Sequence, residues 1–117
     1  LVAEIGDCAA LCAIDVARRD DVQRAVDDAV SRWSRLDILV CSAGVMDREP
    51  FLEASDSHWE KVSGINLRGT FLCGQLAARQ MVVQGNGGRI VNVASNSSLI
   101  LMRASRTIGP QVSKSTS

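Results

Sequence analysis

The sequence contains no tyrosine, and tryptophan and phenylalanine together make up only 3% of its 117 residues. A phenol is a common general acid or base, so any such chemistry in this chain must use other groups. An excess of charge of one sign is also missing, because 13 Lys and Arg residues offset 13 Asp and Glu residues. This balance gives no indication of a nucleic-acid or anionic-membrane partner.

The usual ligands of a structural metal are scarce as well. The chain has one histidine, His58, and four cysteines. The spacings of the cysteines, at positions 8, 12, 41 and 73, are not those of a zinc site. We therefore predict no metal site, reduced thiols in a cytoplasmic protein, and a solvated side chain for His58. No apolar run approaches the roughly 20 residues that span a membrane.

What is present is an ordinary globular composition, with 46% hydrophobic and 22% charged residues. The length allows one domain. Residues 1–5 followed by Gly6 are typical of the last turn of a helix and its terminal glycine. From that pattern we expect the chain to be a fragment of a longer domain.

The apolar runs predict alternating strands and helices. Residues 9–16 and 36–41 are short apolar runs that indicate buried strands. Between them, a helix capped by Asp20 or Asp21 presents apolar residues at steps of three and four up to Trp33.

A second, longer helix is predicted over residues 56–83, capped by Ser55 or Asp56. Three internal glycines suggest close packing or a local distortion, because glycine disfavours a helix by up to about 1 kcal/mol. The predicted apolar face contains Trp59, Val62, Ile65, Leu72, Leu76 and Met81. A glycine-rich turn follows at 85–88, and a third strand is predicted over 89–94.

This order of elements predicts an α/β fold, with a Rossmann-like, doubly wound parallel sheet of three strands. Ligands of such sheets bind at the carboxyl ends of the strands. Small polar residues lie at the carboxyl ends of all three predicted strands: Asp15, the 42–44 segment and Ser95. We therefore expect the functional site at that edge.

Four segments resemble motifs of the short-chain dehydrogenases/reductases. LDILVCSAG at 36–44 is similar to the family's L-D-I-L-V-N-N-A-G, and INLRGTF at 65–71 to its I-N-x-x-G-x-F. GRIVNVAS at 88–95 is similar to G-x-I-V-N-x-x-S, and Asp15-Val16 to the D-V pair at the end of the family's third strand. They occur in the family's order, in a chain about half the family's usual length.

The resemblance implies roles for individual residues. Asp15 and Val16 would contact the adenine end of NAD or NADP. Ser42, Ala43 and Gly44 would line the cofactor, where small residues let the backbone approach closely. Asn66 would distort its helix and hold a water for proton relay, and Ser95 would be the catalytic serine that orients the substrate oxygen.

Two parts of the family pattern are missing. These residues contain no Gly-rich loop after an opening strand, the loop whose amides hold the pyrophosphate. The Y-x-x-x-K pair is incomplete: residues 110–114 place Pro110 at the tyrosine and Lys114 at the lysine that binds the ribose and assists proton transfer. An alternative alignment places Lys114 at the tyrosine position itself; we prefer the first.

The resemblance thus implies a single partial Rossmann-like domain over 1–117, without the N-terminal Gly-rich unit and the C-terminal part. The parent enzyme would transfer hydride between NAD(P) and a carbonyl or secondary alcohol, whereas this chain is expected to be inactive. One alternative is a degenerate binding or scaffold subunit that associates through the 56–83 helix. Another is an unrelated nucleotide-binding parallel-sheet domain.

The family's strand order predicts a gap in the sheet. Residues 9–16 would be an outer strand whose neighbours are absent here, so about 14 Å would separate it from the 36–41 strand. We expect either that residues 9–16 pair directly with that strand or that the chain is marginally stable.

Overall fold

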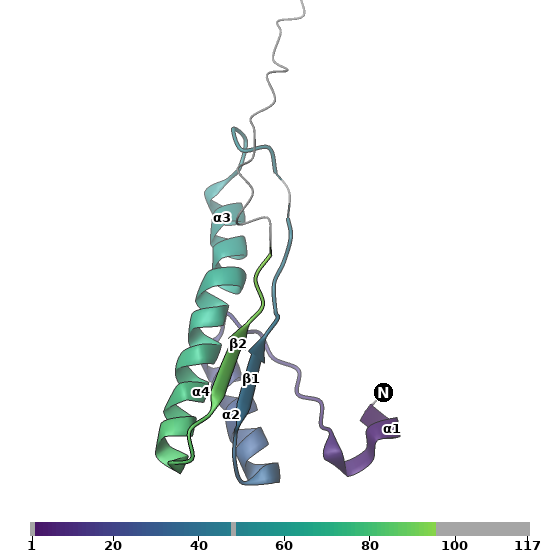
Figure 1. The fold of residues 1–117 in the computed structure, drawn as a ribbon. Helices are drawn as coiled ribbons and strands as arrows, with labels where there is room; N and C mark the ends of the chain where they lie inside the picture. Colours follow the sequence, from purple (N-terminus) through teal and green to yellow (C-terminus); the bar gives the residue numbers. More distant parts are fainter. Residues whose placement is uncertain (1, 48, 96–117) are drawn as a thin grey trace, which may run out of the picture.

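The computed structural model describes residues 2–47 and 49–95. One continuous helical region lies beside a small two-stranded sheet (Figure 1). In order, the elements are α1 (Val2–Ile5), the 3-10 turn η1 (Gly6–Cys8), α2 (Arg19–Trp33), β1 (Ile38–Cys41), α3 (Asp56–Ser63), the π-helical η2 (Gly64–Gly69), α4 (Thr70–Gln84) and β2 (Arg89–Asn92).

The two strands form a parallel pair, as a β-helix-β crossover requires. The register places Ile38 opposite Arg89 and Cys41 opposite Asn92. The Val93 amide donates to the Cys41 carbonyl at 2.9 Å, so the pairing continues past the last strand residue. The predicted strands at 36–41 and 89–94 are therefore confirmed, each in a shorter form.

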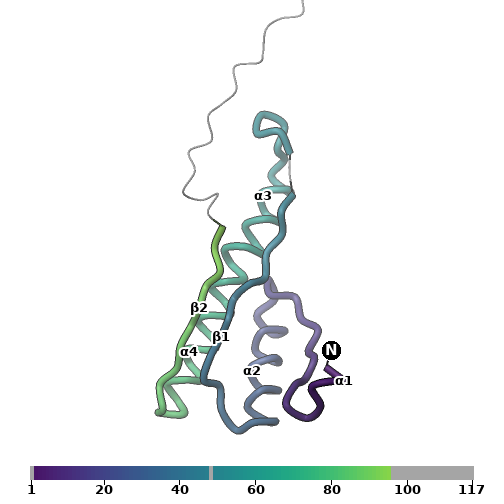
Figure 2. Tube along the Cα trace, turned by 45° about the vertical axis from the view of Figure 1, so that its right-hand side comes forward, coloured from purple at the N-terminus to yellow at the C-terminus, as the bar shows by residue number. Residues whose placement is uncertain are grey.

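The prediction of a third strand at 9–16 is wrong for the described structure. This segment is extended, and its exposed and half-buried residues alternate from Leu11 to Val16, but it pairs with no strand. Figure 2 shows it running beside α2 and apart from β1. A β-strand exists only with a partner that satisfies its N–H and C=O groups, and the described residues offer none at this position. The sheet thus has two described strands rather than three.

Helix α2 begins one to two residues before the predicted caps. Its first residue is Arg19, and the residue before it, Arg18, makes no side-chain capping bond. Asp21 instead lies in the first turn, where a carboxylate is stabilised by the helix dipole. The predicted apolar face is confirmed at Val22 and Val26, which are buried. Ser34 ends the helix with a left-handed φ of 64°.

The long helical region is confirmed, and it contains the predicted distortion. Ser55 is the cap, because its hydroxyl oxygen accepts a bond from the His58 amide at 3.2 Å. The backbone then widens into the π-helix between Gly64 and Gly69 before α4 continues to Gln84. A Cβ on Gly69 would lie 2.8 Å from Val16 Cγ2, so this glycine permits close packing.

The core lies between α2 and α4. Val22, Val26, Leu72 and Leu76 form one buried cluster, with Leu36 and Cys73 packed against it. Of the predicted face of the long helix, Leu72, Leu76 and Met81 are buried, whereas Trp59 is exposed. Among the described residues, no helix combines the length and apolar character that crossing a membrane would need.

Candidate functional site

The carboxyl end of β1 carries three small, exposed residues, Ser42, Ala43 and Gly44. A cavity of about 70 Å³ lies beneath this end of the strand, and its lining includes Val16, Ser42, Ala43 and Gly69. The close contact between Gly69 and Val16 brings the 9–16 segment to this edge. Val16, Ser42 and Ala43, three of the residues predicted to contact the cofactor, therefore line one cavity.

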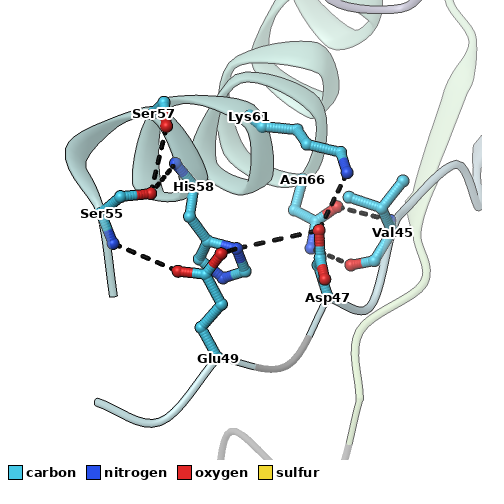
Figure 3. Close-up of polar contacts among 8 residues, drawn as sticks. All are labelled: Val45, Asp47, Glu49, Ser55, Ser57, His58, Lys61 and Asn66. Carbon is cyan, nitrogen blue, oxygen red and sulfur yellow. Dashed lines mark hydrogen bonds and ion pairs between the residues drawn. The ribbon is translucent and has the colours of Figure 1, made fainter. Parts of the chain in front are cut away.

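Asn66 binds the backbone just after these small residues. Its Oδ1 accepts a hydrogen bond from the Val45 amide at 2.8 Å, and its Nδ2 donates to the Val45 carbonyl at 2.9 Å. Figure 3 shows the side chain reaching from the helix to this backbone. A Cβ on Gly44 would lie 3.4 Å from Asn66 Oδ1, so Asn66 and Gly44 are adjacent.

The π-helix contains Asn66, the residue that contacts the segment after β1. A π turn leaves main-chain groups out of the regular i to i−4 pattern, and such turns are frequent at functional sites. The Thr70 hydroxyl donates to the Asn66 carbonyl at 2.8 Å, which gives that oxygen a partner. The distortion predicted from the resemblance is therefore present, centred on the residue that the resemblance identified.

Asp15 and Val16 are fixed to the start of α2. The Asp15 amide donates to Asp21 Oδ2 at 2.9 Å, and Asp15 Oδ1 accepts from the Ala17 amide at 2.9 Å. The bond from the Asp15 amide is the main cause that lowers the pKa of Asp21 below its ordinary value. Val16 faces Gly69, whereas the Asp15 side chain is exposed and bonds to its own loop.

Ser95 lies at the same edge by register. It is the third residue after Asn92, just as Gly44 is the third after its partner Cys41. Ser95 and Gly44 thus both lie three residues past the carboxyl ends of the paired strands. Lys114 and Pro110, predicted for the ribose and tyrosine positions, lie outside the described residues.

Two thiols lie directly below the site. Cys41 ends β1, Cys73 projects from α4, and the two side chains hydrogen-bond to each other. Burial raises the pKa of both thiols, so both remain protonated near neutral pH. All four cysteines are free. Cys41 and Cys73 therefore behave as packing residues.

Sequence reasoning missed Gln84 and misjudged His58. Gln84 Oε1 accepts from the Leu36 amide at 3.0 Å, and its Nε2 donates to the Leu36 carbonyl at 2.7 Å. Nothing in the spacing of Gln84 indicates this role. The side chain of His58 is only 14% exposed and lies between two carboxylates, so it is not a solvated residue.

A sequence profile of the short chain dehydrogenases matches residues 1–107. The chain belongs to the short-chain dehydrogenase/reductase family. This membership excludes the alternative of an unrelated nucleotide-binding domain, and it accounts for the crossover between β1 and β2.

Individual members of the family agree. The chain is 42% identical over 82 residues to the oxidoreductase YohF of Escherichia coli, covering 70% of this chain and 32% of that protein. It is 38% identical over 93 residues to a sorbitol dehydrogenase of Cereibacter sphaeroides, covering 80% and 36%. A crystal structure of a short-chain type dehydrogenase/reductase from Mycobacterium marinum superposes with a TM-score of 0.73 at 35% identity, covering 75% and 36%.

These comparisons establish the α/β Rossmann fold of the family for the matched part. The chain spans about a third of the length of the curated relatives it matches.

Proposed function

We propose that this chain supplies part of the active site of an NAD(P)-dependent oxidoreductase that acts on a carbonyl or secondary alcohol. The observation that carries the proposal is the convergence of Ser42, Ala43, Gly44 and Asn66 at the carboxyl end of β1. We also propose that residues 1–117 form a single partial domain, located in the cytoplasm, as the free cysteines favour.

The residues present fit a dinucleotide at this edge. Ser42, Ala43 and Gly44 are exposed and carry nothing larger than a hydroxymethyl group, so a flat cofactor could approach the backbone closely. The nicotinamide, when bound, supplies the hydride chemistry. The proposed cofactor is NAD or NADP. Asp15, Val16 and Lys114 are further proposed contacts of this cofactor.

In this proposal the chain's own residues hydrogen-bond the substrate and position the backbone that lines the cofactor. Ser95 would donate a hydrogen bond to the substrate oxygen and so orient it for hydride transfer. Asn66 fixes Val45 and thereby the course of the chain after the cofactor-lining residues. No residue of the chain supplies a phenol for proton transfer, because the sequence contains no tyrosine.

We therefore expect cofactor contact without turnover from the 117-residue chain. Amide NMR signals of Ser42 to Gly44 should shift when NADH or NADPH is added, while those of Ser34, at the far end of α2, should not. A turnover assay with both cofactors and a broad carbonyl panel should give no robust rate. A full-length family member serves as the positive control.

The two arms of this experiment contradict different statements. Signals at Ser42 to Gly44 that do not move with either cofactor would contradict the proposed cofactor edge. A robust rate from this chain alone would contradict its proposed inactivity.

A second candidate, a binding or scaffold subunit, is favoured by exposed apolar residues on the long helix. Trp59, Leu67 and Phe71 are 69%, 71% and 57% exposed, and Leu67 and Phe71 line one exposed face of the helical region. This face would mediate a homo-oligomer, or association with an intact relative, through the 56–83 helix. Light scattering that shows a strict monomer, alone and with a full-length relative, would reject this candidate.

A further inference from the structure

Two acidic residues in the segment after β1 contact a histidine of α3. Asp47 Oδ2 lies 3.7 Å and Glu49 Oε1 lies 3.4 Å from His58 Nδ1. Figure 3 draws these three side chains close together. The side chain of His58 is mostly buried, whereas both carboxylates are partly exposed. An imidazole in this position faces two negative charges from a different segment of the chain.

The same two carboxylates make further contacts with the helical region. Lys61 Nζ donates to Asp47 Oδ2 at 2.8 Å, and this bond raises the pKa of Lys61 above its ordinary value. Glu49 Oε2 accepts from the amide of Ser55, whose hydroxyl caps α3 by accepting from the His58 amide. Glu49 therefore contacts both the cap of α3 and the ring of His58.

Histidine is the only side-chain type whose unperturbed charge change falls between about pH 5 and 8. Ordinary carboxylates are ionised above about pH 5, and lysine stays cationic, whereas the charge of an ordinary imidazole changes between about pH 5 and 8. Among the described residues, no group of three or more metal-ligating side chains could hold an ion. A proton on this imidazole would face both carboxylates at once.

We propose that His58 is a proton-sensitive clamp, which in its protonated form pairs with Asp47 and Glu49 and ties the segment after β1 to α3. Asp47 is two residues from Val45, which Asn66 holds. Protonation of His58 thus tightens the backbone next to the candidate site. The clamp is independent of the proposed dehydrogenase activity, because its effect appears in the chain's own backbone.

Amide hydrogen exchange of the full chain, followed by NMR, tests the clamp. Protection factors of the Val45 and Ser55 amides should rise about fivefold from pH 7.5 to pH 5.5, which corresponds to about 1 kcal/mol for partly exposed ion pairs. Correction for the intrinsic exchange rate at each pH is included in the protection factor. The Ser34 amide, bonded to the Val30 carbonyl at the far end of α2, should show no such change.

Three variants separate the clamp from other causes. His58→Gln should abolish the pH dependence at Val45 and Ser55. Glu49→Gln, which keeps the imidazole, should reduce it to about twofold, and it replaces the first variant if circular dichroism shows that His58→Gln loses its helices. Glu60→Gln, an exposed neutralisation on the same helix, should leave it unchanged.

The proposal is overturned if the wild-type amides show no pH dependence, or if His58→Gln or Glu49→Gln retains all of it. Loss of the dependence in Glu60→Gln would also overturn it, because the titrating interaction would then lie elsewhere on α3. None of these readouts requires cofactor binding or turnover, so failure of the clamp is distinguishable from failure of the proposed function.

Discussion

At the scale of single residues, two side-chain amides take the place of strand neighbours. An amide side chain has one acceptor oxygen and one NH₂ donor, so it can pair with both the N–H and the C=O of one backbone residue. Asn66 does this at Val45, and Gln84 does it at Leu36. Each amide therefore satisfies a peptide group that would otherwise need a strand or water beside it.

Replacing Asn66 by alanine tests the value of this pairing. Both bonds to Val45 are lost, and we expect the free energy of unfolding to fall by about 1 kcal/mol, within the usual range for exposed neutral hydrogen bonds. Urea denaturation measures the loss, and NMR hydrogen exchange should show faster exchange of the Val45 amide in the folded chain.

Asn86→Ala is the matched control, since Asn86 is an exposed asparagine in the turn after α4. It should change stability by less than about 0.5 kcal/mol, as is usual for surface positions. Equal losses in the two variants, or an unchanged Val45 amide in Asn66→Ala, would show that the Asn66 pairing does not stabilise the segment.

The sequence indicated a role for Asn66 but none for Gln84. By propensity alone Asn66 is merely a poor helix former, and only the surrounding motif indicated a role. Gln84 lies in an ordinary helix-favouring context, and nothing local distinguishes it from a solvated glutamine. Its role depends on where Leu36 lies in space, which the pattern around residue 84 does not contain.

At the scale of elements, the two amide pairings require the long helix and β1 to match in length. Asn66 and Gln84 are 18 positions apart, roughly 27 Å along a helix. Leu36 and Val45 are nine positions apart, roughly 30 Å along an extended chain. The near equality lets one helix hold both ends of one extended segment, with α4 packed on β1 between them.

The glycines of this helix provide a test of its packing. A Cβ on Gly69 would lie 2.8 Å from Val16 Cγ2 and 3.2 Å from Val16 Cβ, so Gly69→Ala forces the 9–16 segment away. We expect the free energy of unfolding to fall by about 1–3 kcal/mol, the usual cost of overpacking. Chemical denaturation measures this loss.

Gly74→Ala is the matched control on α4, because nothing lies within 4 Å of its added Cβ. Alanine is the better helix former, so this variant should gain up to about 1 kcal/mol. A Gly69→Ala variant as stable as Gly74→Ala would mean that Val16 is not packed against the helix.

Helices and strands could be predicted where the residues that stabilise them are close together in the sequence. The buried faces of α2 and α4 and the cap at Ser55 follow from residues a few positions apart. These predictions are confirmed except at Trp33, which is 44% exposed. The strand at 9–16 has the right apolar run, but a strand also needs a neighbour. The alternating exposure from Leu11 to Val16 is typical of a strand, but no described strand pairs with this segment.

At the scale of the whole molecule, the sheet exposes apolar side chains that a complete doubly wound sheet would bury. Ile38 and Val40 of β1 are 61% and 58% exposed, and Val91 and Val93 are also exposed. The buried core of the described residues is small, and it lies almost entirely between α2 and α4. Of the two outcomes expected from the gap in the sheet, direct pairing of the 9–16 segment with β1 does not occur.

Marginal stability is therefore the outcome that we expect for the isolated chain. Little apolar surface is buried, and a two-stranded sheet with one covered face contributes little by itself. Thermal unfolding followed by circular dichroism at low protein concentration should show a broad transition below about 45 °C, under the usual range for mesophilic domains. Because association through the exposed faces would stabilise the chain, the midpoint should rise with concentration if it oligomerises. A sharp transition at or above about 45 °C whose midpoint does not depend on concentration would contradict this expectation, because the monomer would then need a larger core than the one between α2 and α4.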